Sequence, residues 1–241
     1  MCFTIELHLT RKAIEERFTV DTSALYDFDF RYFYRAFSNP YLPVITQDQP
    51  RQIQMFQWGL IPGWTRNREM AEHIRQGTYN ARAESIHEKP SFREPFRRGR
   101  CLVIAHGFFE WQQINNGRIP WYIRLKNNEP FTFAGLHDTW YDPDSGESVN
   151  SFSIITTYAN PLLEKIHNTQ KRMPVILPRK IETEWINETI SLRKAFGLLI
   201  PIHEKALHAY TISNRISEKG TDPFDPDTLK PYDHPVTGTL F

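Results

Sequence analysis

Short apolar runs that follow one another closely dominate the hydropathy pattern of this chain. Each run is bounded by Gly, Pro, Asp or Asn, the residues that favour turns. β-Branched and aromatic residues fill the runs, as is typical of strands. The pattern predicts strands at Phe3–Leu7 and in the segments CLVIAHGFF, FTFAGL, SFSIITT, MPVILP and HAYTIS.

The segment EWQQINNGRIPWYIRL gives the clearest local prediction. The pair Asn116-Gly117 separates two apolar-rich runs, and Asn-Gly in this position is the strongest short-range signal for a β-hairpin. Helices have weaker signals, at Thr10–Phe18, at Ile181–Glu188 and as one short turn in ANPLLEKIHN.

The order of these elements predicts the fold class. In ANPLLEKIHN, Asn160 is expected to cap a helix that begins with Pro161. The strand candidates do not alternate with helices, so we expect an α+β fold with a mainly antiparallel, barrel-like core and peripheral short helices. One domain is expected over residues 1–241, with residues 220–241 as an irregular wrap rich in Pro and Asp.

Composition narrows the class of protein. With 241 residues, 40 % of them hydrophobic, the chain is able to bury a sizeable core. No apolar run approaches the roughly 18 residues of a membrane span, and the N-terminus does not resemble a signal peptide. We therefore expect a soluble, cytoplasmic monomer, nucleoid-associated if bacterial, without a membrane partner.

Charge and cysteine content limit the partners. Cys2 and Cys101 make neither a disulfide framework nor a metal-ligand spacing, so no metal and no cofactor is expected. The 29 basic and 28 acidic residues leave a net charge of +1, so a nucleic-acid site would have to be a local basic cleft.

The cysteine at position two is the most informative single residue. In structural terms, Cys2 begins a strand and packs inward as a small hydrophobic residue. In chemical terms, the initiator methionine is removed before a small side chain, and Cys2 then carries a free amine beside its thiol. Such a 1,2-aminothiol condenses with an aldehyde to an imine, and its sulfur closes a thiazolidine ring.

The amine of such a residue is the better first nucleophile. An α-amine with a pKa near 7.8 is roughly 15 % neutral at pH 7, against roughly 0.04 % for an ordinary lysine. The sequence therefore offers Cys2 as a group that captures aldehydes.

Three other segments carry candidate chemistry. In TYNARAES, an extended backbone would place Asn80, Arg82 and Glu84 on one face, either as site residues or as a solvated edge. Glu110 lies between two aromatic residues, where it either turns to solvent or is desolvated with a raised pKa. His167 follows the short helical turn, as a cap or as a catalytic imidazole.

Seven segments in a fixed order point to one family. The segments MC, WGLIPGW, YNARAES, RCLVIAHGFFEW, FAGLHDTW, SIITTYANPLLEKIHNTQKRMPVIL and TISN are collinear over most of the chain. Together they resemble the SRAP family, the SOS-response-associated peptidase domain. The resemblance implies a single β-rich domain with a groove for single-stranded DNA and covalent capture of abasic sites, whose opened sugar carries an aldehyde.

The resemblance also implies a role for individual residues. Cys2 matches the nucleophile that forms the crosslink, and Asn80 matches the residue that holds it and the opened sugar. Arg82 matches an arginine that contacts DNA phosphate. Glu110 matches the carboxylate that moves protons in imine formation and methionine removal, and His167 matches the histidine that assists ring opening. One carboxyl and one imidazole suffice for this proton transfer, so no metal is needed.

The chain departs from the family pattern in three places. It begins with Cys2-Phe3-Thr4 where the family usually has Cys-Gly-Arg. Two extra residues lie in NTQK after His167, and FSNPYLP replaces an Asn-Ala-Pro turn. None of these changes affects Asn80, Glu110 or His167.

Two other functions stay open. A thiol peptidase would use Cys2 as nucleophile, His167 as base and Asn80 as an orienting group. A non-covalent DNA-binding module would use Trp58 and Trp64 for stacking and the basic stretch Arg93–Arg100, Arg100 included, for phosphates. Core packing is the structural alternative for both tryptophans. An abasic-site protein would combine self-processing with lyase-like imine chemistry and show little turnover.

Overall fold

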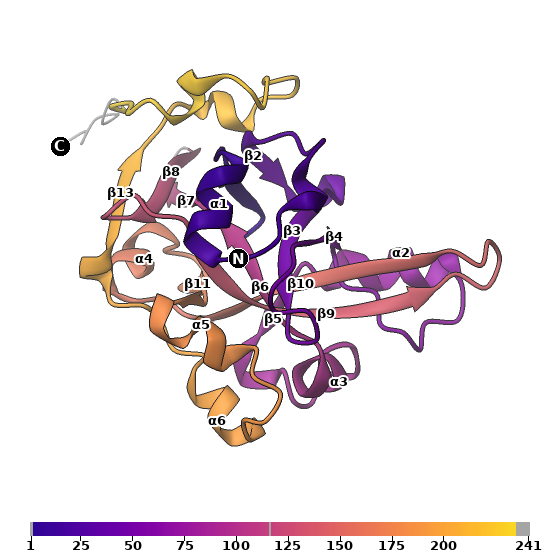
Figure 1. The fold of residues 1–241 in the computed structure, drawn as a ribbon. Helices are drawn as coiled ribbons and strands as arrows, with labels where there is room; N and C mark the ends of the chain where they lie inside the picture. The colour runs from indigo at the N-terminus through magenta and orange to yellow at the C-terminus, as the bar shows by residue number, and fades with distance from the viewer. Residues whose placement is uncertain (1, 116, 235–241) are drawn as a thin grey trace.

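A computed structural model describes residues 2–115 and 117–234 (Figure 1). Its strands are β1 (Thr4–Leu7), β2 (Arg31–Arg35), β3 (Tyr41–Thr46), β4 (Gln54–Trp58), β5 (Asn80–Arg82), β6 (Arg100–Ala105), β7 (Gly107–Ile114), β8 (Gly117–Leu125), β9 (Phe131–Tyr141), β10 (Ser148–Tyr158), β11 (Arg172–Pro174), β12 (Ile176–Leu177) and β13 (Leu207–Thr211). Its helices are α1 (Arg11–Phe18), α2 (Arg68–Gly77), α3 (Pro90–Arg98), α4 (Pro161–Ile166), α5 (Arg179–Trp185) and α6 (Leu192–Gly197). Short 3₁₀ turns include η2 (Ala36–Ser38), η3 (Ala83–Ser85), η5 (Asn214–Ser217) and η6 (Pro226–Leu229).

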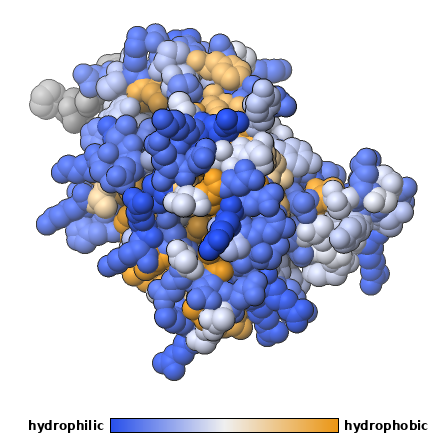
Figure 2. Space-filling model, in the orientation of Figure 1, coloured by the Kyte–Doolittle hydropathy of each residue, from blue (hydrophilic) through white to orange (hydrophobic). Residues whose placement is uncertain are grey.

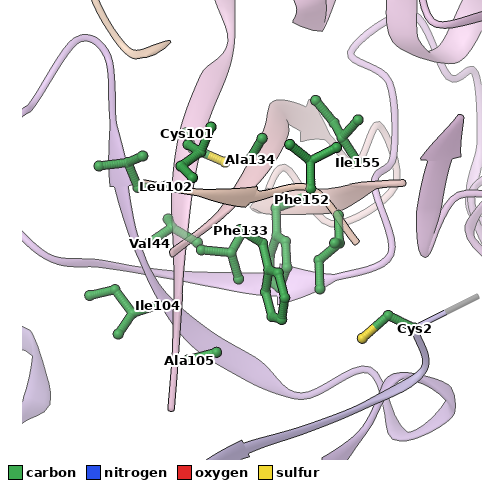
Figure 3. Close-up of a cluster of buried hydrophobic side chains, with 14 of the residues drawn as sticks. Cys2, Val44, Cys101, Leu102, Ile104, Ala105, Phe133, Ala134, Phe152 and Ile155 are labelled. Carbon is green, nitrogen blue, oxygen red and sulfur yellow. The ribbon is translucent and has the colours of Figure 1, made fainter. Parts of the chain in front are cut away.

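A closed barrel forms the centre of the molecule. Its strands pair in the order β10-β4-β3-β6-β9, and β9 pairs again with β10, which closes the ring. Closure leaves these strands without a free edge. Figure 3 shows side chains of the core, among them Val44, Phe133 and Phe152, with Cys2 at the edge of the cluster.

A second sheet with the order β13-β8-β7-β1-β2 lies beside the barrel. Strand β1 is its fourth member and pairs with both β7 and β2. Because β1 begins two residues after Cys2, this sheet fixes the start of the chain against β7.

The predicted α+β class with a β-rich core is confirmed. Most strand pairs are antiparallel, although β10 pairs in parallel with β4 and with β5. The hairpin is confirmed by the register of β7 and β8, from Gly107 opposite Arg124 to Ile114 opposite Gly117. Asn116 itself lies outside the described residues. Asn160 caps α4 by accepting from the backbone N–H of Leu163, as expected.

Some expected elements differ in the structure. The segment CLVIAHGFF forms two strands, because His106 leaves the ladder and its N–H donates to the carbonyl of Glu6. MPVILP likewise splits at Val175 into β11 and β12. Six further elements were not predicted from the sequence: β2, β3, β4, α2, α3 and α6. Helix propensity does not predict α3, because the helix contains Pro95 in its interior as well as Pro90 at its start.

Residues 220–234 follow the molecule's surface near β2 (Figure 1). Within the expected wrap of residues 220–241, the described part contains η6 and an isolated bridge between Ile212 and Pro231. Residues 235–241 lie outside the described part. The face in Figure 2 is mainly hydrophilic, with hydrophobic residues in small separate patches. Among the described residues, no helix has the length and apolar content needed to cross a membrane.

A buried ion pair holds β1 against the β6–β7 corner. Glu6 is 1 % exposed, and its Oε2 accepts from His106 Nδ1 at 2.9 Å and from the Tyr122 hydroxyl at 3.0 Å. His106 Nε2 lies 3.1 Å from the carbonyl oxygen of Asn128. Both neighbours of the ring only accept, so both ring nitrogens carry protons and the ring is an imidazolium. Burial lowers the pKa of His106, but the hydrogen bond and charge of Glu6 outweigh burial and raise it.

We expect His106→Gln to destabilise the protein in a pH-dependent way. A raised pKa in the folded state means that the stabilisation is complete below the unfolded pKa of His and is lost as pH rises through the folded pKa. At pH 6 the variant should lose about 1.5–3 kcal/mol of unfolding free energy, the usual range for a hydrogen bond to a charged group. Urea unfolding at pH 6 and pH 9 measures the difference, which should shrink at pH 9. The exposed His208→Gln is the control; an equal loss at both pH values would contradict the assignment.

Candidate functional site

The pairing of β1 with β7 places the start of the chain beside the strand that carries Glu110. Ile5 lies opposite Phe108 and Glu6 opposite Gly107 in an antiparallel pair. Continued in the same register, the residue after Cys2 faces Glu110. The antiparallel arrangement therefore explains how residues separated by more than a hundred positions share one site.

Cys2 is completely buried, and its backbone is held by Asn80. The Asn80 Nδ2 donates to the carbonyl oxygen of Cys2 at 2.9 Å, and Cys2 Sγ lies 3.9 Å from the carbonyl oxygen of Thr4. Asn80 Oδ1 is buried and has no hydrogen-bond partner among the described residues. Since an unsatisfied buried acceptor costs free energy, this oxygen is ready to accept from a donor that enters the site.

Strand β5 determines the position of Asn80. It pairs in parallel with β10, with Asn80 opposite Ile154 and Arg82 opposite Thr156. Asn80 is 8 % exposed, whereas Arg82 is exposed. The expected shared face does not extend to Glu84, because the chain leaves the strand after Arg82 and turns into η3.

Glu110 is buried, which decides between the two alternatives that the sequence left open. Glu110 is 3 % exposed. Burial raises the pKa of its carboxyl, and the nearby charge of His167 opposes the rise. The pKa of the Cys2 thiol is also raised, first by burial and then by the charge of Glu110. Cys2, Glu110 and His167 are therefore close enough to interact electrostatically.

His167 is fixed in one tautomer by its neighbour. It follows the last residue of α4, and its Nδ1 lies 2.9 Å from the carbonyl oxygen of Arg172. A carbonyl only accepts, so Nδ1 carries a proton, and any lone pair of the ring is on Nε2.

Arg172 and Glu84 support His167 from behind, and no local pattern in the sequence indicates this support. The Arg172 guanidinium forms a two-fold ion pair with Glu84, at 2.7 and 3.0 Å, and donates to the carbonyl oxygen of Thr156. Burial alone would raise the pKa of Glu84, but Arg172 holds it below its usual value. Glu84 thus positions the residue whose carbonyl orients His167.

A pocket of about 230 Å³ opens at this site. Glu110 and His167 line it together with Phe3, Trp111 and Arg118. Its volume is several times the roughly 30 Å³ that one molecule occupies in liquid water. Glu110 and His167 thus face a space large enough for a small ligand group, and the backbone of Cys2 leads directly to its wall at Phe3.

Two of the residues expected to bind DNA are corrected by their burial. Trp58 is 0 % exposed, stacks against Phe152 and donates to the carbonyl oxygen of Tyr79. Arg100 is 1 % exposed and donates to backbone carbonyls, including that of Trp185. Neither side chain is able to reach a DNA strand, so both have structural roles.

The other two expected DNA contacts are accessible. Trp64 is 48 % exposed. Arg82 lines a hollow of about 580 Å³ together with Asn80 and Lys89. In residues 2–115 and 117–234 no group of three or more His, Cys, Asp or Glu side chains is arranged to hold a metal ion.

Comparison with known proteins gives consistent matches. Residues 1–219 match the sequence model of the family described as SOS response associated peptidase (SRAP). The "Abasic site processing protein YoqW" of Bacillus subtilis is 35 % identical over 227 residues, covering 92 % of this chain and 97 % of the relative. The "Abasic site processing protein HMCES" of Rattus norvegicus is 32 % identical, covering 76 % of this chain and 58 % of the relative.

A solved structure has the same fold. A crystal structure of a protein from Bacteroides thetaiotaomicron has 37 % sequence identity and a TM-score of 0.90, covering 96 % of this chain and 100 % of the other. A structure from Bordetella bronchiseptica has 24 % identity and a TM-score of 0.76, covering 88 % of this chain and all of the other, and supports the fold alone.

Proposed function

The chain belongs to the SOS response associated peptidase family, and from this premise we propose that it captures abasic sites in single-stranded DNA through Cys2. The printed names of its relatives, abasic site processing proteins, support the lesion as substrate. The observation that carries the proposal is the hydrogen bond from Asn80 to the carbonyl oxygen of Cys2, beside the buried Glu110 and His167. It holds the cysteine backbone where its amine is needed.

The proposed reaction joins an aldehyde to an aminothiol. After hydrolysis of the bond between Met1 and Cys2, the free amine of Cys2 attacks C1′ of the ring-opened sugar and forms a carbinolamine. Loss of water gives an imine. The sulfur then adds to the same carbon, and its proton passes to the nitrogen, which closes the thiazolidine. One aldehyde and one aminothiol thus give one thiazolidine and one water.

The pKa directions support an order in which the amine reacts first. A thiolate, not a thiol, is the sulfur nucleophile, and burial raises the pKa of the Cys2 thiol. The thiol is therefore protonated at neutral pH, which disfavours direct attack by sulfur as in a thiol peptidase.

Glu110 and His167 are proposed to move the protons. A raised pKa means that the Glu110 carboxyl keeps its proton to a higher pH than an ordinary glutamate does, which favours a group that donates as well as accepts. Nε2 of His167 is suited to accept the proton of the anomeric hydroxyl while an acid protonates the ring oxygen. The same groups are proposed to assist removal of Met1, so the protein processes itself once and turns over little. The proposed location is the cytoplasm, in association with the nucleoid if the cell is bacterial.

One experiment separates this proposal from the two alternatives. Methionine-free protein is incubated with abasic single-stranded DNA and, separately, with a labelled peptide, and both are run on a denaturing gel. A denaturant-stable DNA adduct is expected. Cleavage of the peptide without an adduct would indicate a thiol peptidase, and binding that does not survive denaturation would indicate a non-covalent module.

Arg82→Ala is expected to weaken binding to all single strands alike. A phosphate contact carries no sequence information, and each contact contributes about 0.7 to the slope of log affinity against log salt. The slope should therefore fall by about that amount, measured by fluorescence anisotropy between 50 and 200 mM salt, roughly the range over which such slopes are defined. The exposed Arg51→Ala is the matched control. An unchanged slope would assign Arg82 a structural role.

A further inference from the structure

A second hollow, of about 520 Å³, adjoins the pocket that Glu110 and His167 line. The two share Phe3, Trp111 and Arg118, so they lie side by side. The wall of the second hollow is completed by residues that include Phe37 and Ile216. A ligand group that enters the first pocket therefore places its immediate neighbour at the second.

The aromatic side of this hollow is exposed and rigidly placed. Phe37 is 68 % exposed, and its ring lies 5.0 Å from the Phe3 ring at an interplanar angle of 27°. Tyr79 packs edge-on against both rings, and its hydroxyl donates to Asn39 Oδ1 at 2.9 Å. The N–H of Ala36 donates to the carbonyl oxygen of Phe3 at 2.8 Å, which ties turn η2 to the start of β1. A large ring held by neighbours yet open to solvent is a prearranged stacking surface.

The charged residues of the hollow are both cationic. Arg35 and Arg118 line it, and among the described residues no acidic side chain does. Arg35 is fixed by donating to the carbonyl oxygen of Ile216 at 2.7 Å. Arg118 borders both hollows and donates to Gln113 Oε1 at 3.1 Å. An aromatic face beside two arginines is complementary to a nucleotide, a planar base joined to an anionic phosphate.

We propose that this hollow binds the nucleotide next to the abasic residue, with its base stacked on Phe37 and the intervening phosphate at Arg118. The inference rests on the proposed function, since it takes the abasic sugar to occupy the neighbouring pocket. An abasic residue has no base to stack on, so the adjoining base loses one neighbour in the strand, and the ring of Phe37 replaces it. Stacking on an aromatic side chain tolerates every base, so the site adds affinity without a sequence requirement.

The test uses a strand that binds without reacting. A single-stranded oligonucleotide carries a tetrahydrofuran residue, which has no aldehyde, and the fluorescent base 2-aminopurine directly 5′, directly 3′ or several nucleotides away. We expect the native protein to quench 2-aminopurine at one adjoining position and not at the distant one. Phe37→Ala should abolish that quenching and weaken binding about ten-fold or more, the usual cost of a lost base–aromatic stack. Phe37→Tyr should retain both.

A matched control and a second readout make the outcomes distinguishable. Tyr141→Ala removes an aromatic ring that is 69 % exposed at the end of β9 and should change neither quenching nor affinity. Native protein is also incubated with a true abasic strand of the same sequence. If the adduct forms but Phe37→Ala binds like the native protein, the inference is overturned and the hollow belongs to another partner. If no adduct forms, the proposed function is contradicted, whatever the binding of Phe37→Ala.

Discussion

Replacement of Cys2 by alanine is expected to abolish the heat-stable adduct with abasic DNA while non-covalent binding stays within a few-fold of native. Only an aminothiol closes a thiazolidine, and alanine provides the amine without the sulfur. The imine should still form, because alanine is also small enough for the initiator methionine to be removed. Borohydride should therefore trap a covalent product with the Cys2→Ala variant, whereas heating without borohydride should release the DNA.

The second cysteine supplies the matched control. Cys101 lies on β6 in the barrel core and is as completely buried as Cys2. Cys101→Ala removes the same atoms, so it should leave the adduct undiminished on a denaturing gel. Undiminished heat-stable crosslinking by Cys2→Ala would mean that another nucleophile captures the aldehyde.

Glu110→Gln is expected to slow crosslinking by about 10²- to 10⁴-fold, the range for loss of a general acid or base. Glutamine keeps the size of the side chain and removes its ability to exchange a proton. Because burial raises the pKa of Glu110, the native rate should change with pH above the usual range of a glutamate carboxyl, and this dependence should disappear in the variant. A larger fraction of Glu110→Gln molecules should also retain Met1, as mass spectrometry would measure, if removal is self-catalysed.

Comparison with His167→Ala separates the roles proposed for Glu110 and His167. Each variant is tested on the closed-ring abasic sugar and on a small aldehyde that has no ring to open. His167→Ala should slow the first reaction far more than the second, whereas Glu110→Gln should slow both. The ratio of the two rates cancels weak folding as an explanation. Equal slowing of both reactions by His167→Ala would contradict a role in ring opening and leave it as a cap of α4.

The sequence was most informative where local chemistry and a fixed order of segments coincide. The position of Cys2, the alternation in TYNARAES and the apolar setting of Glu110 are all local, and the structure brings these residues together with His167. The Asn-Gly hairpin and the cap at Asn160 depend on short-range geometry and were predicted for the same reason.

Long-range pairing accounts for what the sequence did not reveal. Arg172 and Glu84 are 88 positions apart, and nothing local indicates their ion pair. Tryptophan and arginine both carry a polar group on a side chain with a large apolar part. Either residue type is therefore found in the core or at the surface of proteins, and its type alone does not predict the burial of Trp58 or Arg100. Their burial depends on carbonyl oxygens at Tyr79 and Trp185 that only the folded chain supplies.

The stacking surface at Phe37 shows the same limit. Phe37 begins the segment FSNPYLP, which in the sequence is noticeable only because it departs from the family pattern. Its contact with Phe3 depends on the hydrogen bond between Ala36 and Phe3, which joins two distant segments. Phe3 stands where the family usually has glycine, and its contact with the Phe37 ring becomes visible only in the folded chain.

The intact mass of the adduct tests the central claim most directly. Protein expressed in the cytoplasm is incubated with an abasic oligonucleotide and measured without reduction. The predicted mass is that of the chain without Met1, plus the oligonucleotide, minus one water, since thiazolidine formation releases one water. Chains that still carry Met1 should remain unmodified. An adduct found on the chains that retain Met1 would contradict capture by the free amine and thiol of Cys2.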